Sequence, residues 1–258
     1  MLLQWRKPIT IALTPESITI NSGNKAIHTI NVDETATEKS SWSQVLTELE
    51  SYAATIAANK VKFVISNNYV RYAILPWQTD VFSKNDWQSL AENNLREHYG
   101  NIVGNWQVTV AMQGYGKPMI ISAIDQLLIN RIDTLAKQFN WTVESIEPAL
   151  MSVTNQYRNK INNTSFMLMT EQQRVLVAEI DKGCLVGFSV TSPLIGQEQN
   201  ESNKLIKRIL KMHSAGSSFI HYFGDQGLQA NSDLESAKVI PLAINPEGSA
   251  MSIMLAKS

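Results

Sequence analysis

The chain has few of the features that point directly to a function. Its 258 residues contain a single cysteine, Cys184, so no disulfide can form within the chain. No charge predominates, since 22 Lys and Arg residues stand against 23 Asp and Glu residues, a net charge of −1. Phosphate-backbone binding needs an excess of basic side chains, so we expect no nucleic-acid partner. The apolar neighbours of Cys184 predict a buried strand thiol rather than a reactive one.

Long apolar runs are also absent. A membrane-spanning helix requires roughly 20 apolar residues. The most apolar segments here, 119–124 and 175–188, are short or interrupted by charged residues. The N-terminal residues 1–8 lack the long apolar core of a secretory signal. We therefore expect a cytoplasmic protein that reaches a membrane only peripherally, through a partner.

Recognisable catalytic and metal-binding motifs are missing as well. The four histidines lie far apart and share no metal-ligand spacing, and no P-loop or nucleophile elbow is present. Asp80 and Asp86 could form a pair of carboxylates, but the pattern around Asp86 places it at the start of a helix, where a carboxylate favours the helix dipole. We predict no catalytic residue and no metal site.

The sequence does contain a fold pattern that occurs twice. Alternating apolar and polar residues predict an opening β-hairpin at 9–20 and a second opening hairpin within 164–190. Helical patterns and further strands follow each hairpin, so we predict an α/β protein with two lobes, 1–160 and 161–258, whose mixed sheets are flanked by helices. Further strands are expected at 26–32, 61–66, 70–75, 106–112, 118–123, 141–146, 218–223 and 239–242, and helices at 42–58, 85–99, 126–139, 204–213 and 249–255, with 193–202 as a loop.

Four segments carry a resemblance to known proteins: Ile-Ala-Leu-Thr-Pro-Glu-Ser-Ile-Thr-Ile at 11–20, residues 135–150, the second hairpin, and Phe-Ile-His-Tyr-Phe-Gly-Asp at 219–225. Together they resemble the actin-like ATPase superfamily, and within it the PilM-like and GspL-like cytoplasmic proteins of type IV pilus and type II secretion assembly. The resemblance implies duplicated actin-like lobes of the ribonuclease H-like type.

The nucleotide motifs of that superfamily are altered in this chain. The superfamily holds phosphate and magnesium with two Asp-x-Gly turns, and two consecutive glycines follow a strand on the adenosine side. The corresponding segments here are Ala12-Leu13-Thr14, Met169-Thr170-Glu171 and Phe223-Gly224-Asp225. The resemblance therefore implies a degenerate cleft without a cofactor, a pseudo-ATPase, with the cleft residues Thr14, Thr170, Glu171, Gly224 and Asp225.

Two other classes of function stay open. One is an actin-like ATPase or kinase that still binds Mg-ATP between the lobes, in which case the five cleft residues line one pocket and a further acidic base faces it. The other is a regulatory domain that binds a small ligand between the lobes.

Two surface features are candidates for partner binding. The helix at 201–213 has an apolar stripe and a basic face, which is either a solvated face or a contact for anionic lipid or an acidic partner. Trp77 follows a strand end in Leu75-Pro76-Trp77-Gln78 and is either a core residue or an anchor for an incoming peptide. The basic residues of the helix are Lys204, Lys207, Arg208 and Lys211.

The resemblance implies a role for these surfaces. PilM-like proteins hold the cytoplasmic tail of a single-span inner-membrane partner, and GspL-like proteins also engage an assembly ATPase. We therefore expect a non-catalytic cytoplasmic scaffold at the inner face of the inner membrane, with the tail added as a strand or lying in a groove.

Overall fold

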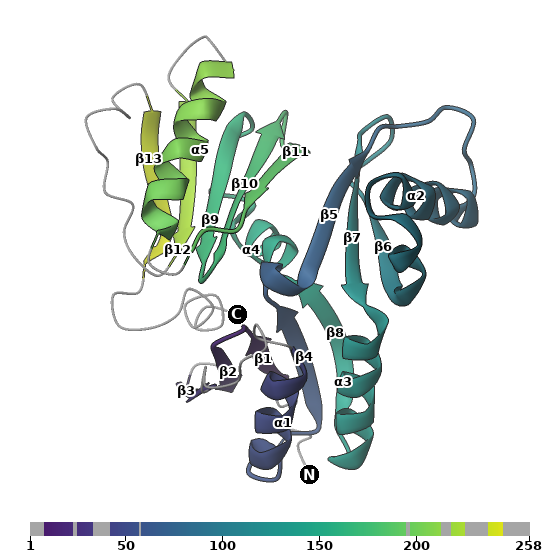
Figure 1. Cartoon of the computed structure of the whole chain (residues 1–258), viewed down its shortest axis with the longest axis vertical. Helices are drawn as coiled ribbons and strands as arrows, with labels where there is room; N and C mark the ends of the chain where they lie inside the picture. Colours follow the sequence, from purple (N-terminus) through teal and green to yellow (C-terminus); the bar gives the residue numbers. More distant parts are fainter. Residues whose placement is uncertain are drawn as a thin grey trace, which may run out of the picture.

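Three β-sheets surround a central helix, α4 (Ala149–Tyr157), in the computed structural model of the chain (Figure 1). The structure describes residues 8–22, 25–32, 42–56, 58–194, 197–212, 218–224 and 237–244. Among the described helices, none is both long enough and apolar enough to cross a membrane.

The first sheet has the strand order β3-β2-β1-β4-β8. Its first three strands form an antiparallel meander, and β4 and β8 run parallel to β1. Ile11 and Leu13 of β1 belong to the apolar cluster shared with α1 and α3, whereas Ala12 packs in the cluster around α4. Because both faces are covered, β1 is buried along its whole length. The elements are β1 (Ile9–Leu13), β2 (Ser17–Ser22), β3 (Lys25–Asn31), α1 (Trp42–Ala53), β4 (Lys60–Ile65), α3 (Gln126–Gln138) and β8 (Thr142–Pro148).

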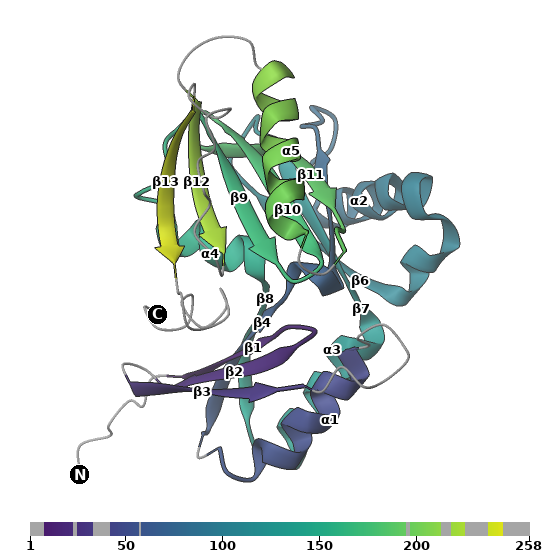
Figure 2. The ribbon, with the colours of Figure 1, turned by 60° about the vertical axis from the view of Figure 1, so that its left-hand side comes forward.

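The second sheet repeats this arrangement as β11-β10-β9-β12-β13, with the same strand directions. One face packs on α4 through Met167 and Met169, and the other packs on α5 through Leu168 and Val177. Figure 2 shows α5 lying along the outer face of this sheet. The repeated topology confirms the predicted α/β class with duplicated lobes. The elements are β9 (Ser165–Glu171), β10 (Arg174–Asp181), β11 (Cys184–Thr191), α5 (Glu198–Met212), β12 (Ser218–Gly224) and β13 (Ala237–Ile244).

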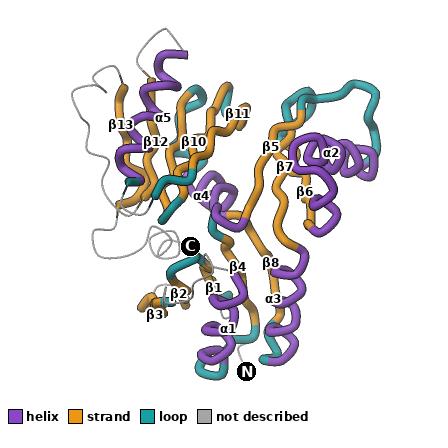
Figure 3. Tube along the Cα trace, viewed as in Figure 1, coloured by secondary structure: helices purple, strands orange, loops and turns teal. Residues whose placement is uncertain are grey.

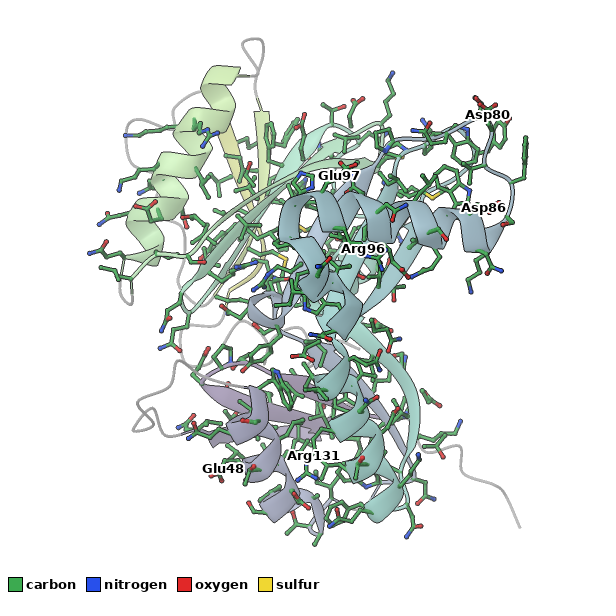
Figure 4. The ribbon with its side chains drawn as sticks, turned by 45° about the vertical axis from the view of Figure 1, so that its right-hand side comes forward. Glu48, Asp80, Asp86, Arg96, Glu97 and Arg131 are labelled. Atoms are coloured by element: carbon green, nitrogen blue, oxygen red, sulfur yellow. The ribbon has the colours of Figure 1, made fainter. Side chains whose placement is uncertain are left out.

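A third, smaller sheet of order β5-β7-β6 stands beside the second sheet and is covered by its own helix, α2 (Figure 3). Trp87 of α2 packs on Met119 and Ile121 of the sheet. The Ser83 hydroxyl caps α2, because it accepts the Asp86 N–H at 3.1 Å and donates to the Asp86 carboxylate at 2.7 Å. Figure 4 shows Asp80 and Asp86 at this outer end of the molecule, and Asp86 lies in the first turn of the helix, at its start as predicted. The elements are β5 (Val70–Leu75), α2 (Lys84–Tyr99), β6 (Trp106–Met112) and β7 (Met119–Asp125).

Several predicted boundaries are wrong. Helix α5 begins at Glu198, although a loop was predicted for residues 198–202 because they are polar and lack apolar periodicity. The acidic residues at 198 and 201 suit a helix N-terminus. Helix α1 ends at Ala53 rather than at residue 58. Residues 181–183 contain two polar residues before a glycine, a pattern that suits a three-residue hairpin loop. The turn has only two residues, because Lys182 and Gly183 have φ of 49° and 73°, as a type I′ turn requires. The helix predicted at 249–255 lies outside the described residues.

Candidate functional site

The candidate site lies between the two lobes, where the central strands of both sheets end. Parallel strands place their carboxyl ends at one edge of a sheet, and residues that follow them collect there. In the first lobe β1 and β4 end side by side, since the Ser66 N–H donates to the Leu13 carbonyl at 2.9 Å. In the second lobe β9 ends at Glu171, directly against the residues that follow β4.

The carboxylate of Glu171 is held by Ser66 and Asn67 from the other lobe. The Ser66 hydroxyl donates to Glu171 Oε2, and the Asn67 side-chain amide donates to Oε1. The backbone N–H of Asn67 also reaches Oε1, at 3.3 Å. Glu171 is 6% exposed and Asn67 is 1% exposed. Both oxygens of this buried carboxylate therefore accept hydrogen bonds from the protein itself.

Asn67 also connects this carboxylate to the third sheet and to the central helix. Its Oδ1 accepts the Tyr72 hydroxyl of β5 at 2.6 Å and the Leu150 N–H of α4 at 3.2 Å. These partners require Oδ1 to face Tyr72 and Nδ2 to face Glu171, so the orientation of the amide is defined. We call Ser66, Asn67, Tyr72, Leu150 and Glu171 the junction network.

Burial dominates the electrostatics of the junction network. It raises the pKa of Glu171 above its ordinary value, while the hydrogen bonds from Ser66 and Asn67 act in the opposite direction. Burial and the nearby charge of Glu171 also raise the pKa of the Tyr72 hydroxyl, which therefore remains a donor to Asn67. The network is thus a set of donors gathered around one acceptor group.

The hydroxyl of Thr14, a predicted cleft residue, forms its hydrogen bonds within the turn between β1 and β2. Thr14 is buried directly after β1, and its hydroxyl donates to the Ser17 carbonyl at 3.0 Å. The same oxygen accepts the Ser17 N–H at 2.9 Å. This reciprocal pair closes the turn between β1 and β2 without a glycine.

Thr170 and Gly224, two further cleft residues, lie next to each other at the ends of β9 and β12. The Thr170 hydroxyl is 2.9 Å from that of Tyr222 and is buried with it. A Cβ on Gly224 would collide with both of these oxygens. The glycine is therefore required for space inside the protein. Asp225, the fifth predicted cleft residue, lies outside the described residues.

Sequence reasoning did not identify Ser66 and Asn67, although a signal was present. Ser66, Asn67 and Asn68 are three consecutive polar residues directly after β4, which is buried in the centre of its sheet. Polar residues at the carboxyl end of a central parallel strand are a common mark of a site. The Ser66 hydroxyl also accepts the Asn68 N–H at 3.1 Å and so begins the short 3-10 turn η1 (Asn67–Tyr69).

A groove of about 770 Å³ opens between the β6–β7 hairpin, α4 and the β10–β11 turn. Of the lining residues that the structure describes, three are cationic, Lys117, Arg158 and Lys182, and none is a carboxylate. Among the described residues these three cations form no ion pair. Gln113 and Leu185 both line the groove. The Gln113 side-chain amide joins its two walls, because it donates to the Leu185 carbonyl and accepts the Leu185 N–H, both at 2.7 Å. The apolar residues of the lining include Met112, Met151, Ile161 and Ile180.

Of the two surfaces predicted to bind partners, α5 covers the face of the second sheet opposite to α4 and to the groove. Trp77 lies closer, because it packs on Tyr115 in the β6–β7 hairpin, which contributes Gly114 and Lys117 to the groove lining. Trp77 is partly buried in the core of the third sheet, with ring-centre distances of 5.4 Å to Trp87 and 5.0 Å to Tyr115. On α5, Leu205 packs into the second lobe, whereas Lys204, Lys207 and Arg208 are exposed. The side chain of Lys211 lies outside the described part of the helix.

Comparison with known proteins identifies the fold. No protein-family model matches the chain, and no curated protein matches it in sequence. Among solved structures it is similar to the PilM–PilN type IV pilus biogenesis complex, with a TM-score of 0.66, 11% identity, and coverage of 98% of this chain and 98% of that chain.

Two further structures agree with that similarity. The cytoplasmic domain of EpsL, an inner-membrane component of the Vibrio cholerae type II secretion system, has a TM-score of 0.59 at 11% identity, covering 96% of this chain and 93% of that one. A Bacteroides thetaiotaomicron protein with an actin-like ATPase fold and unknown function has a TM-score of 0.63 at 10% identity, covering 93% and 94%. The chain therefore has the actin-like ATPase fold, as the resemblance of its sequence predicted.

Proposed function

We propose that the protein is a non-catalytic cytoplasmic scaffold of a pilus or secretion assembly platform, and that it binds the cytoplasmic tail of a single-span inner-membrane partner. The similarity in fold to the PilM–PilN complex and to the EpsL cytoplasmic domain supports this role. An assembly ATPase is a second partner that we propose from the resemblance of the sequence.

The observation that carries the non-catalytic part is the junction network. Glu171 occupies the second phosphate turn, where a catalytic member would direct a carboxylate toward a hydrated metal ion. Here the carboxylate instead accepts hydrogen bonds from Ser66 and Asn67, and the Thr14 hydroxyl is used within its own turn. A metal ion at this position would have to replace these bonds, so the residues present do not fit Mg-ATP well.

The groove between the third sheet and the second lobe is the proposed site for the partner tail. Its volume of about 770 Å³ is typical of a site that encloses a ligand. Within the described part of the chain, its three cations have no ion-pair partner and no carboxylate lines it, which favours a segment that carries acidic as well as apolar side chains. The tail would lie between Met112 on one wall and Met151 on α4.

Saturating Mg-ATP should raise the thermal unfolding midpoint no more than inorganic phosphate with magnesium does. A ligand that binds only the folded state at 100 times its Kd adds about 2.7 kcal/mol, and each kcal/mol moves Tm by roughly 2–4 °C for a chain of this size. Differential scanning fluorimetry with magnesium and an equal concentration of inorganic phosphate as the reference measures this. A saturable rise of several degrees above that reference would contradict the proposal and favour the ATPase or kinase alternative.

Charge reversal in the groove should weaken binding of the partner tail at least about tenfold, because it replaces attraction by repulsion at a partly enclosed site. The variants are Arg158→Glu and Lys117→Glu. Fluorescence polarisation would measure their affinity for labelled peptides that correspond to the cytoplasmic segments of single-span membrane proteins encoded beside this gene.

A control variant distinguishes the groove from the basic face of α5 that the sequence predicted. The double variant Lys207→Glu/Arg208→Glu should bind the peptide as the wild type does. If this control loses affinity and the groove variants do not, the groove is the wrong site. If the wild type binds none of these peptides, the scaffold proposal itself fails.

A further inference from the structure

Two arginines from different lobes meet beside the junction network. Arg71 is in β5, at the start of the third sheet, and Arg174 begins β10. Arg71 Nη1 is 3.3 Å from the Val70 carbonyl, and Arg174 Nη2 is 3.5 Å from the same oxygen. The two guanidinium groups therefore share one backbone acceptor and are close neighbours.

Neither arginine has a counter-ion among the described residues, since no carboxylate oxygen lies within ion-pair distance of either. The carboxylate nearest in sequence to Arg174 is Glu171, whose two oxygens accept hydrogen bonds from Ser66 and Asn67. Two unpaired positive charges side by side repel each other, and they do so more strongly where water is partly excluded.

Several donors of Arg174 lack good acceptors. Its Nε is buried and has no hydrogen-bond partner in the part of the chain that the structure describes. Its Nη1 lies at the long distance of 3.5 Å from the Ser192 hydroxyl. Burial and the charge of Arg71 lower the pKa of Arg174, and the charge of nearby Glu171 offsets this effect only in part. A guanidinium has five donors in a fixed planar fork that matches the oxygens of a phosphate or sulfate group.

We infer that Arg71 and Arg174 form a binding site for a phosphate-sized oxyanion. The bound anion accepts the free donors of Arg174, neutralises the repulsion between the two guanidinium groups, and joins the third sheet to the second lobe. The oxyanion is either free inorganic phosphate or a phosphoryl group carried by a larger molecule. This site stands independently of the groove and of the scaffold proposal.

Titration calorimetry and thermal unfolding with inorganic phosphate test the site, with chloride at equal ionic strength as the reference. The wild type should show saturable binding at low millimolar phosphate and a matching rise in Tm. Arg71→Gln and Arg174→Gln should weaken this binding by at least about tenfold. Arg96→Gln is the control, because it removes an exposed arginine of α2 (Figure 4). Arg96 is paired with Glu92, so this variant should retain the wild-type response and report the general effect of phosphate on stability.

Stability without phosphate provides the second readout. Because Arg71→Gln removes the repulsion, this variant should be at least as stable as the wild type in chloride, which a merely structural arginine would not be. Equal phosphate responses in all variants, or none in the wild type with either phosphate or AMP, would overturn the inference. Stronger binding of AMP than of phosphate would identify a phosphoryl group on a larger ligand as the natural occupant.

Discussion

Replacing Asn67 by alanine should lower the free energy of unfolding by about 4 kcal/mol. The substitution removes the side-chain amide that donates to Glu171 Oε1 and leaves the buried carboxylate with the Ser66 hydroxyl and the long 3.3 Å contact from the backbone N–H of residue 67. It also removes the acceptor for the Tyr72 hydroxyl and for the Leu150 N–H. Each buried polar group left without a partner costs about 1–3 kcal/mol, and a buried charge that loses its partner costs about 3–5 kcal/mol.

The loss should also depend on pH, with a definite sign. Hydrogen bonds from Asn67 lower the pKa of Glu171, so the variant raises this already elevated pKa further above the ordinary value of 4.5. A carboxyl group with a raised pKa contributes most to stability below its unfolded pKa, and that contribution is lost as the pH rises through the folded pKa. The difference between wild type and variant should therefore be larger at neutral pH than at acidic pH.

Urea unfolding of both proteins at a series of pH values measures this effect. Asn68→Ala is the matched control, because Asn68 is the neighbouring asparagine and its side chain donates only to Ser66 Oγ and to the Gln172 carbonyl, at 3.2 and 3.1 Å. It should cost about 1 kcal/mol. Equal losses for the two variants, or a loss for Asn67→Ala that does not change with pH, would contradict the assigned network.

Gly224→Ala should destabilise the protein by about 3 kcal/mol, at the upper end of what overpacking costs. The added methyl group meets the hydroxyl oxygens of Thr170 and Tyr222, all within a buried region between β9 and β12. Gly224 does not have a positive φ. The expected cost therefore arises from the steric collision of the added methyl group rather than from backbone strain.

Removing the colliding atoms should restore part of this loss. In a double-mutant cycle, Gly224→Ala combined with Thr170→Ala should be more stable than the sum of the single effects predicts, by at least about 1 kcal/mol. Gly183→Ala is a useful comparison, because its φ of 73° makes it sensitive to strain while its new methyl group would be 3.5 Å from the Asn163 side chain. Thr170→Ala should not rescue that variant. Additive effects at Gly224 and Thr170 would contradict the collision.

The sequence predicted the duplicated lobes because period-2 alternation is a strong local signal. Ile9, Ile11 and Leu13 do lie on one face of β1, as their spacing indicates. The third sheet was not foreseen as a separate unit, although its strands were each predicted near their observed positions. Which strands pair depends on contacts between distant segments, such as Val70 with Ile124, and no local pattern encodes them. Helix α5 was predicted too short because its first turn has no apolar periodicity.

The candidate site was predicted only in part, because its side-chain contacts also join segments that are distant in the sequence. Thr14, Thr170, Glu171 and Gly224 were chosen by their position relative to strands, and the structure places each of them at the end of β1, β9 or β12. What each side chain contacts is decided by the opposite lobe. Asn67 is the clearest case, since its partners Tyr72, Leu150 and Glu171 come from three different elements. The position of a single asparagine in the sequence does not indicate which distant residues its side chain contacts in the folded protein.

The hydrogen bonds between Gln113 and the backbone of β11 protect an exposed sheet edge from aggregation. β11 is an edge strand, and exposed edges of sheets are templates on which other chains can add strands. The Gln113 side chain donates to and accepts from the Leu185 backbone as the peptide group of a neighbouring strand would. Farther along the edge, Tyr72 of β5 packs on Phe188 with ring centres 5.6 Å apart. The third sheet thus shields this edge from unwanted pairing with another polypeptide, and it does so without closing the sheet into a barrel.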